Sequence, residues 1–74
     1  MTTKTMNEQQ IVAEAQKLIQ DALNKMDASN MEQMSQIIID AATAMNRASI
    51  REYNSAENEL AACKRRMARI TQGD

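Results

Sequence analysis

Few residues of this chain are of the kinds that carry out catalysis. The sequence has no His, the commonest general base and metal ligand in proteins, and a single Cys at position 63. Without a His, Cys63 cannot form the Cys–His pair that activates a thiol nucleophile. No Gly-rich loop is available to bind phosphate groups, because the only Gly is Gly73. We therefore expect no enzymatic activity, no cofactor and no metal ion.

A basic cluster near the C-terminal end is the strongest charge feature; it comprises Lys64, Arg65, Arg66 and Arg69. Such a cluster could contact the phosphates of a nucleic acid. Cations in the last turns of a helix also complement the helix dipole, which is the simpler interpretation. Proteins that bind single strands usually add stacking aromatic side chains, and Tyr53 is the one aromatic residue. Nucleic-acid binding by a helical dimer is therefore an alternative hypothesis.

The elements that position these residues are predicted to be helices. The chain has 74 residues, no Pro and one Gly next to its end, so the two residues that most often end helices are almost missing. Residues 1–6 are expected to form a flexible tail, and residues 7–72 a single helical domain. The predicted helices cover about 8–26, 30–46 and 50–71, with one continuous helix over the last two as an alternative.

Three sequence pairs resemble capping boxes, in which a polar residue caps a helix and a Glu or Gln three residues later caps it in return. These pairs are Asn7–Gln10, Ser29–Glu32 and Ser49–Glu52. The helical apolar pattern also changes register between Met45 and Tyr53. We therefore predict a break near residues 46–49 in preference to a stutter in one long helix.

Apolar residues recur at alternating steps of three and four, as expected for amphipathic helices. The first row is Val12, Ala15, Ile19, Ala22 and Met26, widened by Ile11, Leu18 and Leu23; the second is Met31, Met34, Ile38, Ala41, Met45 and Ala48; the third is Tyr53, Ala56, Leu60, Cys63, Met67 and Ile70. The position of Cys63 in the third row predicts a buried, unreactive thiol.

The Ile residues at positions 37–39 cover about 200° of a helix circumference, at about 100° per residue. This breadth predicts that the segment is buried from more than one side. A small core without large aromatic residues also gains little stability by itself. We therefore predict an oligomer or a complex, with an interface made by Ile37, Ile39, Ile50 and Tyr53.

Charge is unevenly distributed along the chain, although the total is only −1. Residues 1–46 contain three Lys against six Asp or Glu, a net charge of −3, whereas residues 47–74 contain six Lys or Arg against four Asp or Glu, a net charge of +2. Opposite charges favour the two parts lying side by side, within one copy or between two.

The predicted fold class is all-α: a helical hairpin or a small three-helix bundle with coiled-coil-like packing that forms an oligomer. In architecture alone, this layout resembles small secretion-system components and chaperones, plasmid-type hairpin dimers and small phage inhibitors. The leading functional hypothesis is a module that binds and modulates a larger protein, as an adaptor or inhibitor. A self-assembling structural or secretion-system subunit is a further alternative. Neither a secretory signal nor a membrane span is predicted, and the expected location is the cytoplasm.

Overall fold

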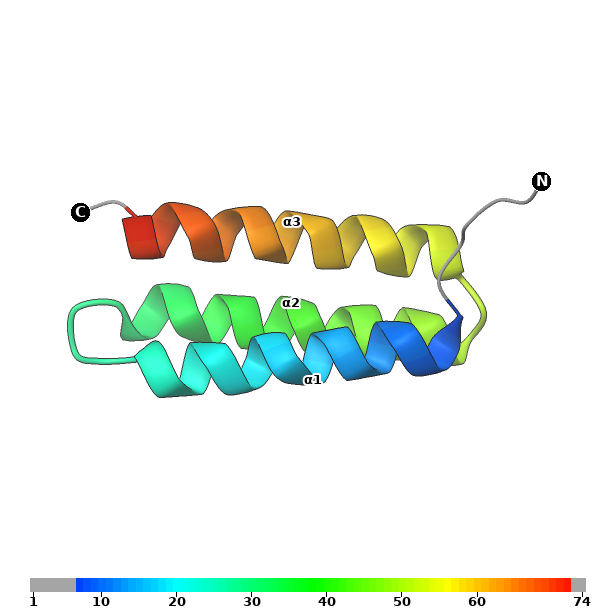
Figure 1. Cartoon of the computed structure of the whole chain (residues 1–74), viewed down its shortest axis with the longest axis horizontal. Coiled ribbons are helices and arrows are strands. Elements are labelled where there is room, and N and C mark those ends of the chain that lie inside the picture. Colours follow the sequence, from blue (N-terminus) through cyan, green and yellow to red (C-terminus); the bar gives the residue numbers. More distant parts are fainter. Residues whose placement is uncertain (1–6, 73–74) are drawn as a thin grey trace.

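The computed structural model describes residues 7–72 and shows three helices over this range: α1 (Glu8–Lys25), α2 (Met31–Ser49) and α3 (Tyr53–Gln72). Figure 1 shows α1 and α3 running in the same direction, with α2 antiparallel to both. The central helix α2 packs against each of the others, whereas α1 and α3 touch one another much less. The all-α prediction is confirmed, and of the two predicted layouts the structure has the three-helix one. The predicted tail, residues 1–6, and Gly73 lie outside the described residues.

The start of α1 is the capping box that the sequence predicts. The Asn7 side-chain oxygen accepts a hydrogen bond from the Gln10 backbone N–H at 2.9 Å, and the Gln10 side-chain oxygen accepts one from the Asn7 N–H at 3.0 Å. Both groups would otherwise lack partners at a helix end. Helix α1 therefore begins within one residue of its predicted position.

The turn between α1 and α2 is built around Asp27. Its Oδ1 accepts hydrogen bonds from the Ser29 N–H at 2.9 Å, the Ser29 hydroxyl at 2.7 Å and the Asn30 N–H at 3.2 Å. These bonds hold the pKa of Asp27 below its usual value of 3.8, since they favour the charged carboxylate. The predicted Ser29–Glu32 capping box does not form, because Ser29 is occupied by Asp27 and the cap position of α2 is Asn30.

The turn between α2 and α3 confirms the predicted break but lies a few residues later than expected. Ser49 is still helical, and its hydroxyl donates back to the Met45 carbonyl at 3.3 Å, so no Ser49–Glu52 capping box forms. The chain then turns at Arg51, whose φ of 67° is in the left-handed region. The Arg51 N–H bonds to the Ala48 carbonyl and the Glu52 N–H to the Arg47 carbonyl. This pair of bonds is a Schellman motif, which closes α2.

Thirteen residues are buried among those that the structure describes, and six of them are Ala. The main cluster runs along the bundle, and a smaller one, made of Ile11, Ala48 and Ala56 with Tyr53 packed against it, lies toward the α2–α3 turn. In α3 the buried residues follow the predicted row, Cys63 included. In α1 and α2 the side that faces the core differs from the centre of the predicted rows. In α1, Ile11 and Leu18 are buried whereas Val12 and Ile19 are half-buried. In α2, Ile37 and Ala44 are buried whereas Ile38 and Met45 are half-buried.

Candidate functional site

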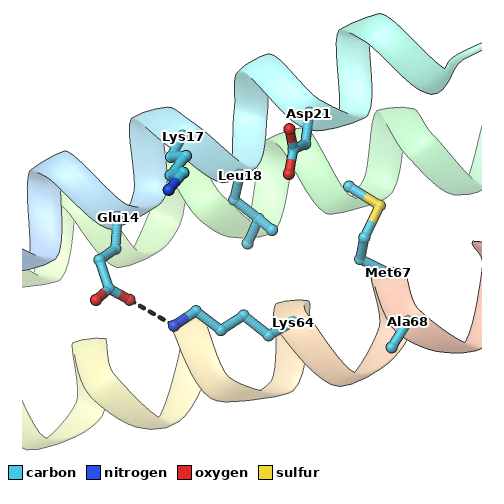
Figure 2. A pocket seen from close by; sticks show the side chains of 7 residues that line it. All are labelled: Glu14, Lys17, Leu18, Asp21, Lys64, Met67 and Ala68. Carbon is cyan, nitrogen blue, oxygen red and sulfur yellow. Dashed lines mark hydrogen bonds and ion pairs between the residues drawn. The ribbon is translucent and has the colours of Figure 1, made fainter.

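Two of the three lines along which helices meet are flanked by ion pairs. Between α1 and α3, the Lys64 ammonium donates to the Glu14 carboxylate, as the dashed line in Figure 2 shows. Between α2 and α3, Arg66 donates to Asp40, and Arg47 Nε lies 4.0 Å from Glu59 Oε1. The pairs Lys64–Glu14 and Arg66–Asp40 join the acidic and basic parts of the chain, as their opposite charges predict.

The third line, between α1 and α2, has no ion pair across it among residues 7–72. One side of this line faces α3, and the other side lies away from it. The charged residues of α1 and α2 identify the side that faces α3. Glu14 and Asp21 of α1 line a groove shared with α3, and Asp40 of α2 pairs with Arg66 of α3. At about 100° per residue, the other flank of each helix carries apolar side chains.

We call this surface the outer face. It is made of Val12, Ile19, Leu23 and Met26 from α1 and Met31, Ile38, Ala42 and Met45 from α2. Leu23 and Met31 are 52% and 53% exposed, Ala42 is also exposed, and the remaining five are half-buried. No charged residue lies on the outer face between Gln9 and Met26 or between Gln33 and Ser49. The charged residues of these segments lie on the flank of their helix that faces α3, or on the solvent side next to that flank.

The neighbouring polar residues on this side are uncharged; they are Gln16, Ser35 and Ser49. Glu8, in the first turn of α1, stands at the far end of the outer face. The resulting surface resembles the core of a protein interface, where charged residues are depleted and Met is enriched. Its three Met residues have flexible, polarizable side chains that adapt to an opposing surface.

A groove between α1 and α3 offers a contrasting surface, with a cavity of about 400 Å³ (Figure 2). Leu18, Met67 and Ala68 form its apolar part; Leu18 and Met67 are only 7% and 6% exposed, whereas Ala68 is exposed. Its other lining includes Glu14, Lys17 and Asp21, and the Glu14–Lys64 ion pair crosses it. This groove therefore combines an apolar floor with charged side chains from both α1 and α3.

The four residues that the sequence predicts as an interface do not share one surface. Ile37 is fully buried in the core, which removes it from any interface of the folded chain. Ile39 and Ile50 are 56% and 58% exposed and lie eleven residues apart on the side of α2 opposite the core. Tyr53 packs against the small cluster near the α2–α3 turn. The three consecutive Ile residues thus face the core, the outer face and the solvent.

The basic cluster is divided between two sides of α3. Lys64 points to α1 and pairs with Glu14, whereas Arg66 points to α2 and pairs with Asp40. Arg65 and Arg69 are exposed and line a shallow cavity of about 200 Å³ with Ala62 and Arg66. Two of the four cations are therefore held in intramolecular pairs, and nucleic-acid binding by this cluster stays a prediction.

Cys63 lies in the core with its Sγ 4.0 Å from the Ile37 carbonyl oxygen. Burial raises the pKa of its thiol to about 11, and the nearby carboxylates Asp40 and Glu59 act in the same direction. A thiol in this environment is protonated at neutral pH and is a poor nucleophile. The predicted burial of Cys63 is confirmed.

Within residues 7–72, no group of three or more His, Cys, Asp or Glu side chains is arranged to hold a metal ion. None of the three described helices combines the length and apolar character required to cross a bilayer. No protein-family model, curated protein or solved structure matches the chain. Its function is therefore inferred from its own surfaces.

Sequence reasoning missed the outer face as a surface because it assigned the same residues to the core. A signal was present: the apolar rows of the first two predicted helices are wider than that of the third. The core of the folded chain fully buries only one side of each wide row, so the other side of the rows on α1 and α2 stays partly exposed. Only the position of α3 shows that both excess stripes face the same side.

Proposed function

We propose that this chain is a helical protein–protein interaction module that acts by binding and not by catalysis. The outer face is the observation that supports the proposal. It joins eight apolar side chains of two adjacent helices into one uncharged surface, while the lines that α3 forms with α1 and α2 are flanked by ion pairs. Apolar surface of this kind is buried favourably when another surface covers it.

The apolar side chains of the outer face run along two adjacent antiparallel helices, a layout against which a further helix can pack. The side chains of α1 on this surface recur at Val12, Ile19 and Met26, seven residues apart, and those of α2 at Met31, Ile38 and Met45 in the same way. A spacing of seven residues, two helical turns, is the repeat with which helices pack along one another. We therefore expect the bound surface to be helical and amphipathic, with anchors at a matching spacing.

The proposal is tested by placing a photocrosslinking amino acid at position 42, in the middle of the outer face, in cells that produce the chain naturally. Ala42 is exposed, so the change leaves the core intact. The matched control is position 61, where another exposed Ala lies on the solvent side of α3. We expect a discrete covalent adduct from position 42 and none from position 61. Equal labelling from the two positions, or no adduct from position 42, would contradict the proposal.

A further inference from the structure

We propose that the outer face binds the outer face of a second copy of this chain, so that the protein forms a symmetric dimer. This inference rests on the proposed function, because it identifies the occupant of the same surface. In the dimer, α1 and α2 of both copies enclose a second apolar core, and each α3 lies outside it.

Charge is the first reason for choosing a second copy. In a symmetric dimer a surface meets itself, so any charge near its centre would be buried close to an identical charge. The central part of the outer face has no charged residue, and Glu8 lies only at its end. The net charge of −1 per copy adds little long-range repulsion between two chains. Two copies of this surface can therefore meet without burying like charges against one another.

The arrangement of apolar residues along the two helices is the second reason. The row on α1 runs from Val12 to Met26 with Ile19 at its midpoint, and the row on α2 runs from Met31 to Met45 with Ile38 at its midpoint. Met26 and Met31 stand on either side of the turn between α1 and α2, and each midpoint lies seven residues from that end of its row. The two midpoints therefore lie at a similar height along the antiparallel pair. A two-fold axis through this point, parallel or perpendicular to the helices, matches the six residues of the two rows with one another, whereas Leu23 and Ala42 have no apolar counterpart at the same height.

The core of the single copy gives the third reason. Six of the thirteen buried residues are Ala, and the fully buried large side chains are few. Domains of this size rarely obtain a large margin of stability from one core. Ile19, Met26, Ile38 and Met45 already pack against the core with one side and are half-buried. Pairing two outer faces would cover the accessible part of these side chains together with the exposed Leu23 and Met31.

The size of the surface is sufficient for a specific but modest interaction. Each row spans fourteen residue steps, which corresponds to about 21 Å of helix, and two adjacent helices are about 20 Å wide. With side chains extending beyond the row ends, the footprint is about 500 Å² per copy, or about 1,000 Å² in total. This is near the lower limit for specific interfaces. Weak and transient interfaces fall in this size range, so the dimer is tested at micromolar concentrations and above.

The test is sedimentation equilibrium of the purified chain and of two matched variants, from about 1 µM to about 500 µM, which brackets a micromolar dissociation constant. Ala42→Glu places a charge on the outer face, and Ala61→Glu makes the same change on the solvent side of α3. Both positions are exposed, so circular dichroism should show unchanged helix content. We expect dimers for the wild type and Ala61→Glu, and a dissociation constant at least tenfold weaker for Ala42→Glu. Leu23→Glu, on α1, should weaken the dimer similarly.

Three outcomes would overturn the dimer. The wild type could remain monomeric up to the highest concentration, Ala42→Glu could dimerise as tightly as the wild type, or Ala61→Glu could weaken the dimer equally. Failure of the dimer and failure of the proposed function are distinguishable. A monomeric chain that still forms an adduct with a different protein from position 42 would refute the second copy and support the interaction module. A monomeric chain without such an adduct would refute both.

Discussion

Arg51 occupies a position where Gly is usually found, and its replacement gives a quantitative test of the α2–α3 turn. Its φ of 67° places a side-chain-bearing residue in the left-handed region at the end of the Schellman motif. This conformation costs an L-residue about 1–2 kcal/mol. Gly avoids that cost but loses about 0.5–1 kcal/mol of additional backbone entropy on folding. Arg51→Gly should therefore raise the free energy of unfolding by about 0.5–1 kcal/mol.

Other effects of this substitution are small. The Arg51 side chain is exposed, so its removal leaves no cavity. Its charge lies between the C-terminal end of α2, where a cation is favourable, and the N-terminal end of α3, where it is unfavourable. These two dipole effects oppose one another, which leaves the backbone term as the dominant contribution.

The assay is thermal unfolding followed by circular dichroism, with all samples at one protein concentration because dimerisation would make Tm concentration-dependent. For a domain of this size the expected rise in Tm is about 4 °C. The matched control is Arg65→Gly, the same change at an exposed position inside α3, which should lower stability by about 1 kcal/mol. A lower Tm for Arg51→Gly, or equal effects of the two substitutions, would refute the left-handed turn at Arg51.

Three further predictions concern the core, the thiol and the first turn. Ile37→Ala should lower the free energy of unfolding by about 2–5 kcal/mol because it empties a fully buried position. Ile39→Ala, on the solvent side, should lower it by about 0.5 kcal/mol or less. Equal effects of the two substitutions in urea titrations would contradict the orientation of α2. Burial raises the pKa of Cys63 from 9.0 to about 11, so between these pH values the unfolded chain loses a proton that the folded chain keeps. The free energy of unfolding should therefore decline as pH rises from about 9 to 11. The Cys63→Ala variant should lack this part of the decline. The effect of pH through Asp27 is opposite, because its pKa is lowered in the folded chain: the charged carboxylate stabilises the fold above pH 3.8, and this stabilisation is lost as pH falls through the folded pKa. The difference in free energy of unfolding between wild type and Asp27→Ala should therefore narrow in acid. A constant difference would show that the Ser29 and Asn30 donors do not hold the carboxylate.

Local sequence signals predicted α1 and α3 well because neighbouring residues determine them. Asn7 and Gln10 complete each other's hydrogen bonds, so the start of α1 is readable from four residues. The apolar row of α3 matches the buried residues of that helix, because α3 has a single apolar stripe and only one way to face the bundle.

The turns were less predictable because several polar residues compete for the same backbone groups. Ser29 could cap α2 or bond Asp27, and the structure shows the second choice. The end of α2 depends on Arg51 adopting a conformation that its residue type disfavours, and no sequence pattern signals it.

The orientation of α1 and α2 could not be read from one sequence. Their apolar stripes are wide enough to face the core in more than one rotation, and the position of α3 decides which part becomes buried. Ile37 was therefore assigned to an interface and Ile38 to the row that faces the core, whereas the structure buries Ile37 fully and leaves Ile38 half-buried against the core. The outer face follows directly from this rotation.

Binding of the outer face to a second copy can be followed by methyl NMR of the isotopically labelled chain over a dilution series. We predict that the methyl signals of Ile19 and Ile38 shift with concentration, whereas those of Ile39 and Ile70, which lie on other surfaces, stay constant. Signals of Ile19 and Ile38 that do not change, or shifts centred on Ile39, would contradict this binding.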